Sequence, residues 1–135
     1  GPSALVVYYP YFVAVKSGTL LLERRRTVVE AVRGDLWNLT TRGQAELTLA
    51  WSEPEQPGEP IRLQGDDALL GPQERVELAR WARRVRAQSR EFVEGGHGLL
   101  LEWSVARDAA PDGQPQGPEY LVFYEWRAVP EKPGD

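Results

Sequence analysis

Residues 72–94, PQERVELARWARRVRAQSREFVE, predict one long amphipathic helix. Proline is favoured in the first turn of a helix, and Glu74 and Glu77 suit the positive end of the helix dipole. Gly95 and Gly96 follow and end the pattern. We expect about 22 helical residues spanning about 33 Å, which is long enough to cross a sheet. The residues that recur at steps of three and four form its buried stripe: Leu78, Trp81, Ala82, Val85, Ser89 and Phe92.

The sequence before this helix predicts extended chain. Residues 4–16 are rich in Val and Tyr, and at Pro10 we expect either a bulge or a division into two short strands, 4–9 and 11–16. A turn is expected at Ser17-Gly18, followed by a second extended stretch over 19–32. A competing interpretation places a helix at 23–40, where apolar residues also fall at helical spacing. The Val and Thr content favours the strands.

Further strands are predicted on both sides of the helix. After turns at 33–35 and 42–43, with an extended segment between them, residues 45–51 alternate between apolar and polar. The acidic, proline-containing segment 52–70 is expected to be a surface loop with a short strand at Ile61–Leu63. Alternation returns at 99–105 and 120–126, joined by a hairpin loop over 109–118 that carries Pro111, Gly113, Pro115 and Gly117.

This order of elements predicts an α+β fold. Strands come first, then one helix, then a hairpin, which differs from the alternating pattern of parallel βαβ proteins. We expect a single domain in which a mainly antiparallel sheet of about five to seven strands packs on one long helix. A length of 135 residues, with 41% apolar and 27% charged residues, suits one ordinary domain.

The ends of the chain suggest its boundaries. Gly1-Pro2-Ser3 resembles a protease-cleavage scar, so we expect the domain at 4–129 and a flexible tail at 130–135. Methionine is absent, and arginine outnumbers lysine fourteen to two, as in proteins from GC-rich bacterial genomes. We therefore expect a domain of a larger bacterial protein.

Composition excludes several classes of function. The chain has no cysteine, so disulfides, thiolate catalysis and Cys-ligated zinc are excluded. The longest apolar run, residues 4–15, is shorter than the roughly 18 residues that a membrane span requires. We accordingly expect a cytoplasmic protein. No phosphate-binding glycine loop is present, and we expect neither a cofactor nor a metal.

Catalytic and metal-binding candidates are weak. His97 is the only histidine, and the glycines around it are explained by the end of the helix, although a small enzyme using His97 stays an alternative. Asp66 and Asp67 follow three upstream glutamates, but their spacing matches no calcium loop. Glu102 and Glu125 lie on the polar side of their strands and are interpreted as exposed charges. We expect no catalytic residue.

Arginine provides the strongest functional signal. Arg83, Arg86 and Arg90 share one flank of the helix, and Arg24 and Arg26 are expected on one strand face. If the two clusters lie side by side, they form a surface for anions or for an acidic partner. The alternative interpretation is a solvated face whose charges are balanced by the acidic loop at 53–67.

Aromatic residues add a second signal. They make up 10% of the chain, more than one sheet-on-helix layer can bury. Tyr9 and Tyr11 are therefore expected at an interface, where Tyr, Trp and Arg are enriched. We expect a non-enzymatic interaction module that binds a protein partner. The alternative is nucleic-acid binding, with the arginines on phosphates and the tyrosines stacking on bases. A net charge of −4 does not favour this alternative.

Overall fold

The computed structural model of the chain describes residues 12–52 and 60–130. The elements in chain order are β1 (Phe12–Leu22), β2 (Thr27–Arg33), α1 (Trp37–Arg42), β3 (Leu47–Trp51), β4 (Ile61–Gly65), the 3₁₀ turn η1 (Asp67–Leu69), α2 (Pro72–Gln88), α3 (Arg90–Glu94), β5 (His97–Ala109) and β6 (Pro115–Pro130). The strands expected at 4–9 and at the start of 11–16 lie outside the described residues.

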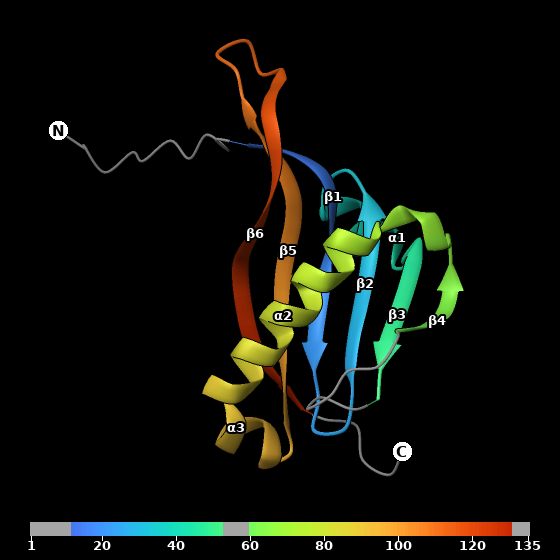
Figure 1. Cartoon of the computed structure of the whole chain (residues 1–135), viewed down its shortest axis with the longest axis vertical. Helices are drawn as coiled ribbons and strands as arrows, with labels where there is room; N and C mark the ends of the chain where they lie inside the picture. The colour runs from blue at the N-terminus through green and yellow to red at the C-terminus, as the bar shows by residue number, and fades with distance from the viewer. Residues whose placement is uncertain (1–11, 53–59, 131–135) are drawn as a thin grey trace, which may run out of the picture.

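The described strands form one antiparallel sheet with the order β4-β3-β2-β1-β5-β6. Helix α2 crosses one face of this sheet diagonally, and the β5–β6 hairpin extends beyond the other strands as an arm (Figure 1). The predicted fold class is confirmed: one α+β domain with six described antiparallel strands and one main helix.

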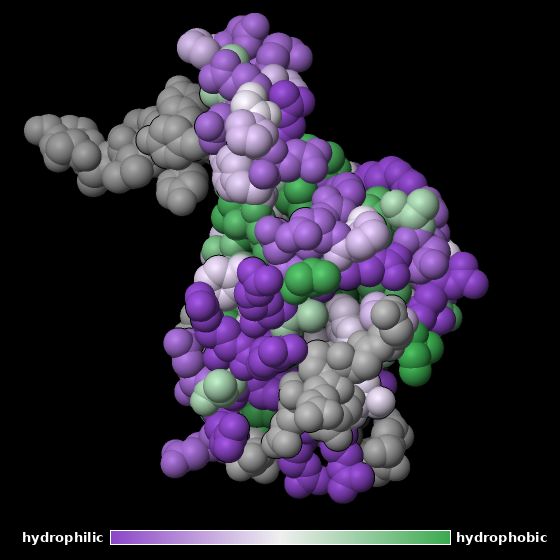
Figure 2. Space-filling model, in the orientation of Figure 1, coloured by the Kyte–Doolittle hydropathy of each residue, from purple (hydrophilic) through white to green (hydrophobic). Residues whose placement is uncertain are grey.

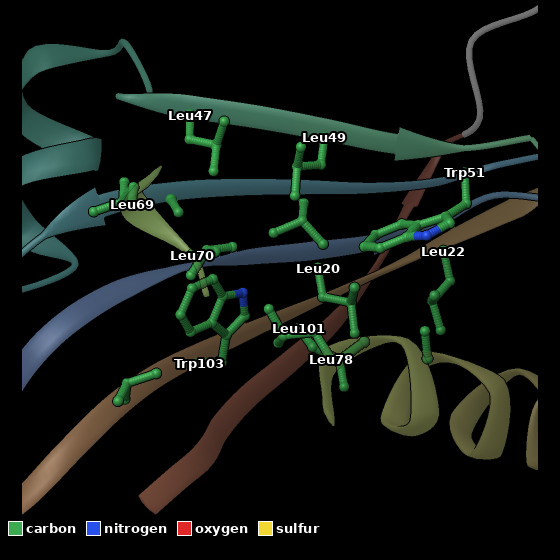
Figure 3. Packing of buried hydrophobic residues seen from close by; sticks show 14 of the residues in the cluster. Leu20, Leu22, Leu47, Leu49, Trp51, Leu69, Leu70, Leu78, Leu101 and Trp103 are labelled. Carbon is green, nitrogen blue, oxygen red and sulfur yellow. The ribbon is translucent and has the colours of Figure 1, made fainter. Parts of the chain in front are cut away.

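The core lies between α2 and the sheet. Leu78 of α2 meets Leu20 and Leu101 of the sheet (Figure 3), and all three side chains are buried. The alternation predicted for the strands accounts for this packing, because Leu99, Leu101, Trp103 and Val105 all face the helix. Trp103 is fully buried at the centre of the layer.

The main helix begins as the sequence predicts. Pro72 occupies the first turn, and the Glu74 carboxylate accepts a hydrogen bond of 2.9 Å from the backbone N–H of Gly71. Glu74 also pairs with Lys16 of β1 at 2.6 Å. This capping carboxylate therefore ties the start of the helix to the sheet.

The helix does not continue unbroken to residue 94. Ser89 leaves the helical conformation, with φ −115°, and its N–H bonds to the carbonyls of Val85 and Arg86. The chain then turns into the short α3, which buries Val93 and stacks Phe92 on His97 at 4.9 Å. The stripe predicted over 78–92 therefore divides between two helices.

The strand prediction is wrong in three places, which are the turn at Ser17-Gly18, the unbroken extended stretch over 19–32 and the extended segment at 36–41. No turn occurs at Ser17-Gly18, because β1 runs through both residues. Gly18 is needed there for close approach: a Cβ atom would lie 1.9 Å from the Glu30 carbonyl oxygen and 2.6 Å from the Trp103 ring. The chain reverses instead between Glu23 and Arg26, where the Glu23 N–H donates to the Arg26 carbonyl at 2.9 Å.

The segment expected to be extended at 36–41 is helical. It forms α1, which ends at Gly43 in the left-handed conformation with φ 65°. Leu36 and Leu39 pack with Val32 in a second, smaller cluster. Because Val32 alternates with Ala31, which belongs to the main core, α1 lies on the sheet face opposite α2.

The competing interpretation of a helix at 23–40 is correct only for its last residues, from Trp37 onward, because residues 27–33 form β2. The short strand predicted at Ile61–Leu63 is confirmed as β4. The predicted hairpin between β5 and β6 is present, but its loop is shorter than the expected 109–118, because β5 runs to Ala109 and β6 begins at Pro115. Among the described residues, no helix is both long and apolar enough to cross a membrane.

Candidate functional site: a groove beside α2

A groove of about 930 Å³ runs along the first half of α2. It lies between the helix and the chain that enters and leaves β4. Hydrophilic residues cover most of the face that carries α2, with hydrophobic surface visible beside the helix (Figure 2). The lining residues come from four parts of the chain: Trp51, Pro60, Asp67, Ala68, Leu70, Gly71, Pro72, Arg75, Val76, Ala79, Arg80 and Arg83.

The lining of the groove is largely apolar. Trp51 and Leu70 are buried residues of the main core that also contact this space. Val76 lies on the outer side of α2 and is 48% exposed. An exposed valine beside two buried apolar residues offers a surface on which an apolar side chain of a ligand gains free energy by burial.

The rim of the groove is basic. Arg80 and Arg83 are exposed, and neither forms an ion pair with any residue in the described part of the chain. Arg75 is different, because its guanidinium is held by the Asp67 carboxylate at 3.0 Å and by the Leu70 carbonyl at 2.9 Å. Of the three arginines, Arg80 and Arg83 are therefore exposed and have no ion-pair partner among the described residues.

Arg86 has an intramolecular role. It donates to the Glu23 carbonyl at 2.5 Å, to the Thr27 hydroxyl at 2.7 Å and to the Arg26 carbonyl at 3.2 Å. Arg26 in turn pairs with the Glu23 carboxylate at 2.6 Å. The two predicted arginine clusters do meet here, but these contacts hold the β1–β2 turn against α2.

The other predicted site residues are dispersed. Arg24 and Arg26 lie in the β1–β2 turn, so the expectation that they share a strand face is wrong. Arg90 is exposed at the start of α3, beyond the break in the helix. Tyr9 and Tyr11 lie outside the described residues. Of the predicted residues that the structure describes, Arg83 alone lines the groove.

The described lining of the groove does not resemble a catalytic centre. Among the lining residues that the structure describes there is no histidine, serine, threonine or tyrosine, and the one carboxylate among them, Asp67, is paired with Arg75. His97 is exposed and stacks on Phe92 away from this space. The lining thus offers side chains for binding and no pair of a nucleophile with a base.

The acidic loop is also engaged within the fold. Asp66 accepts from Arg33 at 2.5 Å, and this bond is the main reason that the pKa of Asp66 is lowered. Glu46 pairs with the same arginine at 3.1 Å. The two described acids of the loop, Asp66 and Asp67, therefore pair with Arg33 and Arg75 and not with the helix flank; Glu53, Glu55 and Glu59 lie outside the described residues. Over the residues that are described, no three potential ligands gather as a metal site would require.

Two residues that define the groove were missed from the sequence. Val76 does not belong to the apolar stripe of α2. An apolar residue on the polar side of a helix was the signal in the sequence that could have indicated this surface. Trp51 was correctly predicted on the buried side of its strand. Its contact with the groove depends on the positions of η1 and α2, which the sequence does not show.

Comparison with known proteins finds no matching family model and no matching curated protein.

Proposed function

We propose that this chain is a protein-binding domain whose groove beside α2 takes an acidic segment of a partner protein with apolar side chains in it. The observation that carries the proposal is the combination of an apolar lining with the exposed guanidinium groups of Arg80 and Arg83 on the rim. Arginine is enriched among the residues that contribute most of the free energy of protein–protein binding.

The chemistry of each part defines the partner. An apolar side chain placed on Trp51 and Val76 loses water-accessible surface, at about 25 cal/mol per Å². Carboxylates beside Arg80 and Arg83 form charge-assisted hydrogen bonds in the fork geometry that guanidinium favours. A segment in which acidic residues alternate with Leu, Phe or Trp meets both requirements.

Charge favours a protein over a nucleic acid. The chain carries a net charge of −4, and Asp67 lies in the groove beside the arginines. A phosphate backbone requires an extended basic track, because its affinity depends on neutralising several charges at once. Arg86 and Arg26, which the nucleic-acid interpretation needs, hold the β1–β2 turn.

Selection from a library of random displayed peptides tests the proposal. Peptides enriched on the wild-type protein should combine Asp or Glu with apolar residues. Arg83→Glu should weaken the binding of an enriched peptide by about tenfold, equivalent to about 1.4 kcal/mol. Arg24→Glu makes the same charge change outside the groove and serves as the matched control.

Two outcomes would reject the proposal. One is that enriched peptides carry no acidic residues or bind Arg83→Glu as tightly as wild type. The other is that a labelled DNA duplex binds more tightly than any selected peptide, with an affinity that falls steeply with salt.

A further inference from the structure

The sheet face opposite α2 carries a chain of hydroxyl groups that ends at the surface. Ser17 of β1 and Ser104 of β5 are paired across the sheet, with 0% and 1% of their surfaces exposed. Their Oγ atoms are 2.7 Å apart, and Tyr124 of β6 continues the chain with its hydroxyl 3.1 Å from Ser104 Oγ. The Tyr124 residue is 43% exposed, so the chain runs from the interior to solvent.

The carbonyl at the inner end of this hydroxyl chain determines which hydroxyl group donates in each of its hydrogen bonds. Ser17 Oγ donates to the Gly34 carbonyl at 2.7 Å, and a carbonyl oxygen accepts only. A serine has one hydroxyl proton, so Ser104 must be the donor to Ser17. Tyr124 must then donate to Ser104.

The Tyr124 hydroxyl at the surface can then only accept a hydrogen bond from a ligand. Its proton points inward, so the Tyr124 oxygen offers only lone pairs to an incoming group. A ligand that reaches this oxygen must therefore donate a hydrogen bond.

The electrostatic surroundings favour a donor that is positively charged. Glu102 and Asp35 lie close enough to raise the pKa of Tyr124, after burial as the first cause. Phe12 places its ring 6.3 Å from the tyrosine ring, which gives an aromatic surface beside the hydroxyl. Lysine and arginine side chains suit both features, because they donate only and also favour aromatic faces.

We infer that Tyr124, with Phe12 and the neighbouring carboxylates, is a docking site for a lysine or arginine side chain of a protein partner. This site is separate from the groove beside α2 and takes the opposite charge. It does not depend on the proposed function of that groove.

The test uses the whole chain labelled with ¹⁵N and titrated with a penta-arginine peptide, with penta-glutamate as the opposite probe. Penta-arginine should shift the amide signals of Tyr124 and Ser104. Tyr124→Phe keeps the ring and removes the acceptor, and it should weaken this binding at least about tenfold, the usual scale of a lost hydrogen bond to a charged group. Tyr120→Phe is the control. Tyr120 lies on β6 like Tyr124, but its hydroxyl donates a hydrogen bond of 2.8 Å to Asp108 of β5 and is not part of the hydroxyl chain.

A second variant tests the direction of the protons. In the Ser17→Ala/Ser104→Ala double variant, the Tyr124 proton loses both inner acceptors and becomes available to an acceptor from solvent. Binding of penta-arginine should fall, and binding of penta-glutamate should rise relative to wild type.

The inference is overturned if Tyr124→Phe binds penta-arginine like wild type. It is equally overturned if the peptide shifts only amides near Asp67 and Arg75, which would mean that it binds acids elsewhere. Arg83→Glu should leave this binding unweakened, so a failure here and a failure of the groove proposal are told apart.

Discussion

The guanidinium of Arg86 donates a 2.5 Å hydrogen bond to the carbonyl oxygen of Glu23, which lies 63 positions earlier in the chain. This contact joins the second half of α2 to the turn between β1 and β2. Arg86 has no acidic residue three or four positions away on its helix, and its guanidinium is instead held by the carbonyl groups of the β1–β2 turn.

Arg86→Ala should destabilise the domain by about 1–3 kcal/mol, because the Glu23 and Arg26 carbonyls and the Thr27 hydroxyl lose a charged donor. Urea unfolding followed by circular dichroism measures the change. Arg84→Ala is the control: Arg84 is exposed on the same helix and lies over the Trp81 ring at 5.1 Å. Its loss should cost about 0.5–1 kcal/mol. Equal effects of the two variants would contradict the role given to Arg86.

Gly18→Ala should cost about 3 kcal/mol or more, because the added methyl group collides with the Glu30 carbonyl and the Trp103 ring in a packed core. Gly71→Ala makes the same change where the nearest atom is 3.8 Å away. That control should lose less than about 1 kcal/mol, since Gly71 only caps the helix. Thermal unfolding of both variants is the measurement, and a stable Gly18→Ala protein would show that Gly18 is not as close to Glu30 of β2 and Trp103 of β5 as described.

Asp66 should make the stability of the protein depend on acidic pH. Its pKa is lowered in the fold, first by the bond to Arg33, so the native state binds fewer protons than the unfolded state as the pH falls. The stabilisation is complete above the ordinary aspartate pKa of about 3.9 and disappears as the pH falls through the lowered value. Asp66→Asn should lack this contribution. The difference in melting temperature between the two proteins should therefore shrink from pH 6 to pH 2, and a constant difference would refute the ion pair.

Tyr124 should have the opposite effect at alkaline pH. Burial, Glu102 and Asp35 raise its pKa, so the native state keeps the phenol proton after the unfolded state has lost it. Stability is fully present below the ordinary tyrosine pKa of about 10 and falls as the pH rises above it. Tyr124→Phe should show a shallower alkaline decline. Absorbance at the phenolate band gives the titration directly, and a Tyr124 that titrates before the other tyrosines would contradict the hydroxyl chain.

Much of the fold was predictable because its signals are local. The helix start at Pro72 and the alternation at 99–105 depend on neighbouring residues, and both are present in the structure. The buried stripe predicted at 78–92 is confirmed only in part, because Leu78 and Ala82 are buried but Trp81 is 39% exposed and the helix breaks at Ser89. The turn expected at Ser17-Gly18 failed for the opposite reason. That glycine is required by Trp103, which lies 85 positions away in the chain and is close only after β1 and β5 pair.

The candidate sites were less accessible to sequence reasoning. Arg83 was identified from its position on the helix, but its groove depends on how Trp51, η1 and α2 come together. The Ser17–Ser104–Tyr124 chain joins three strands and contains no sequence motif. Arg86 and Arg83 look alike in sequence, and only the position of the β1–β2 turn distinguishes them.

By itself the sequence determined the class of the fold, the main helix and the identity of the apolar faces, because periodicity and turn chemistry act over a few residues. Tertiary structure alone decided which arginines are held within the fold, where a groove opens and which hydroxyl groups lie within hydrogen-bonding distance of one another. These properties depend on distances between residues far apart in the chain, and such distances exist only once the sheet has assembled.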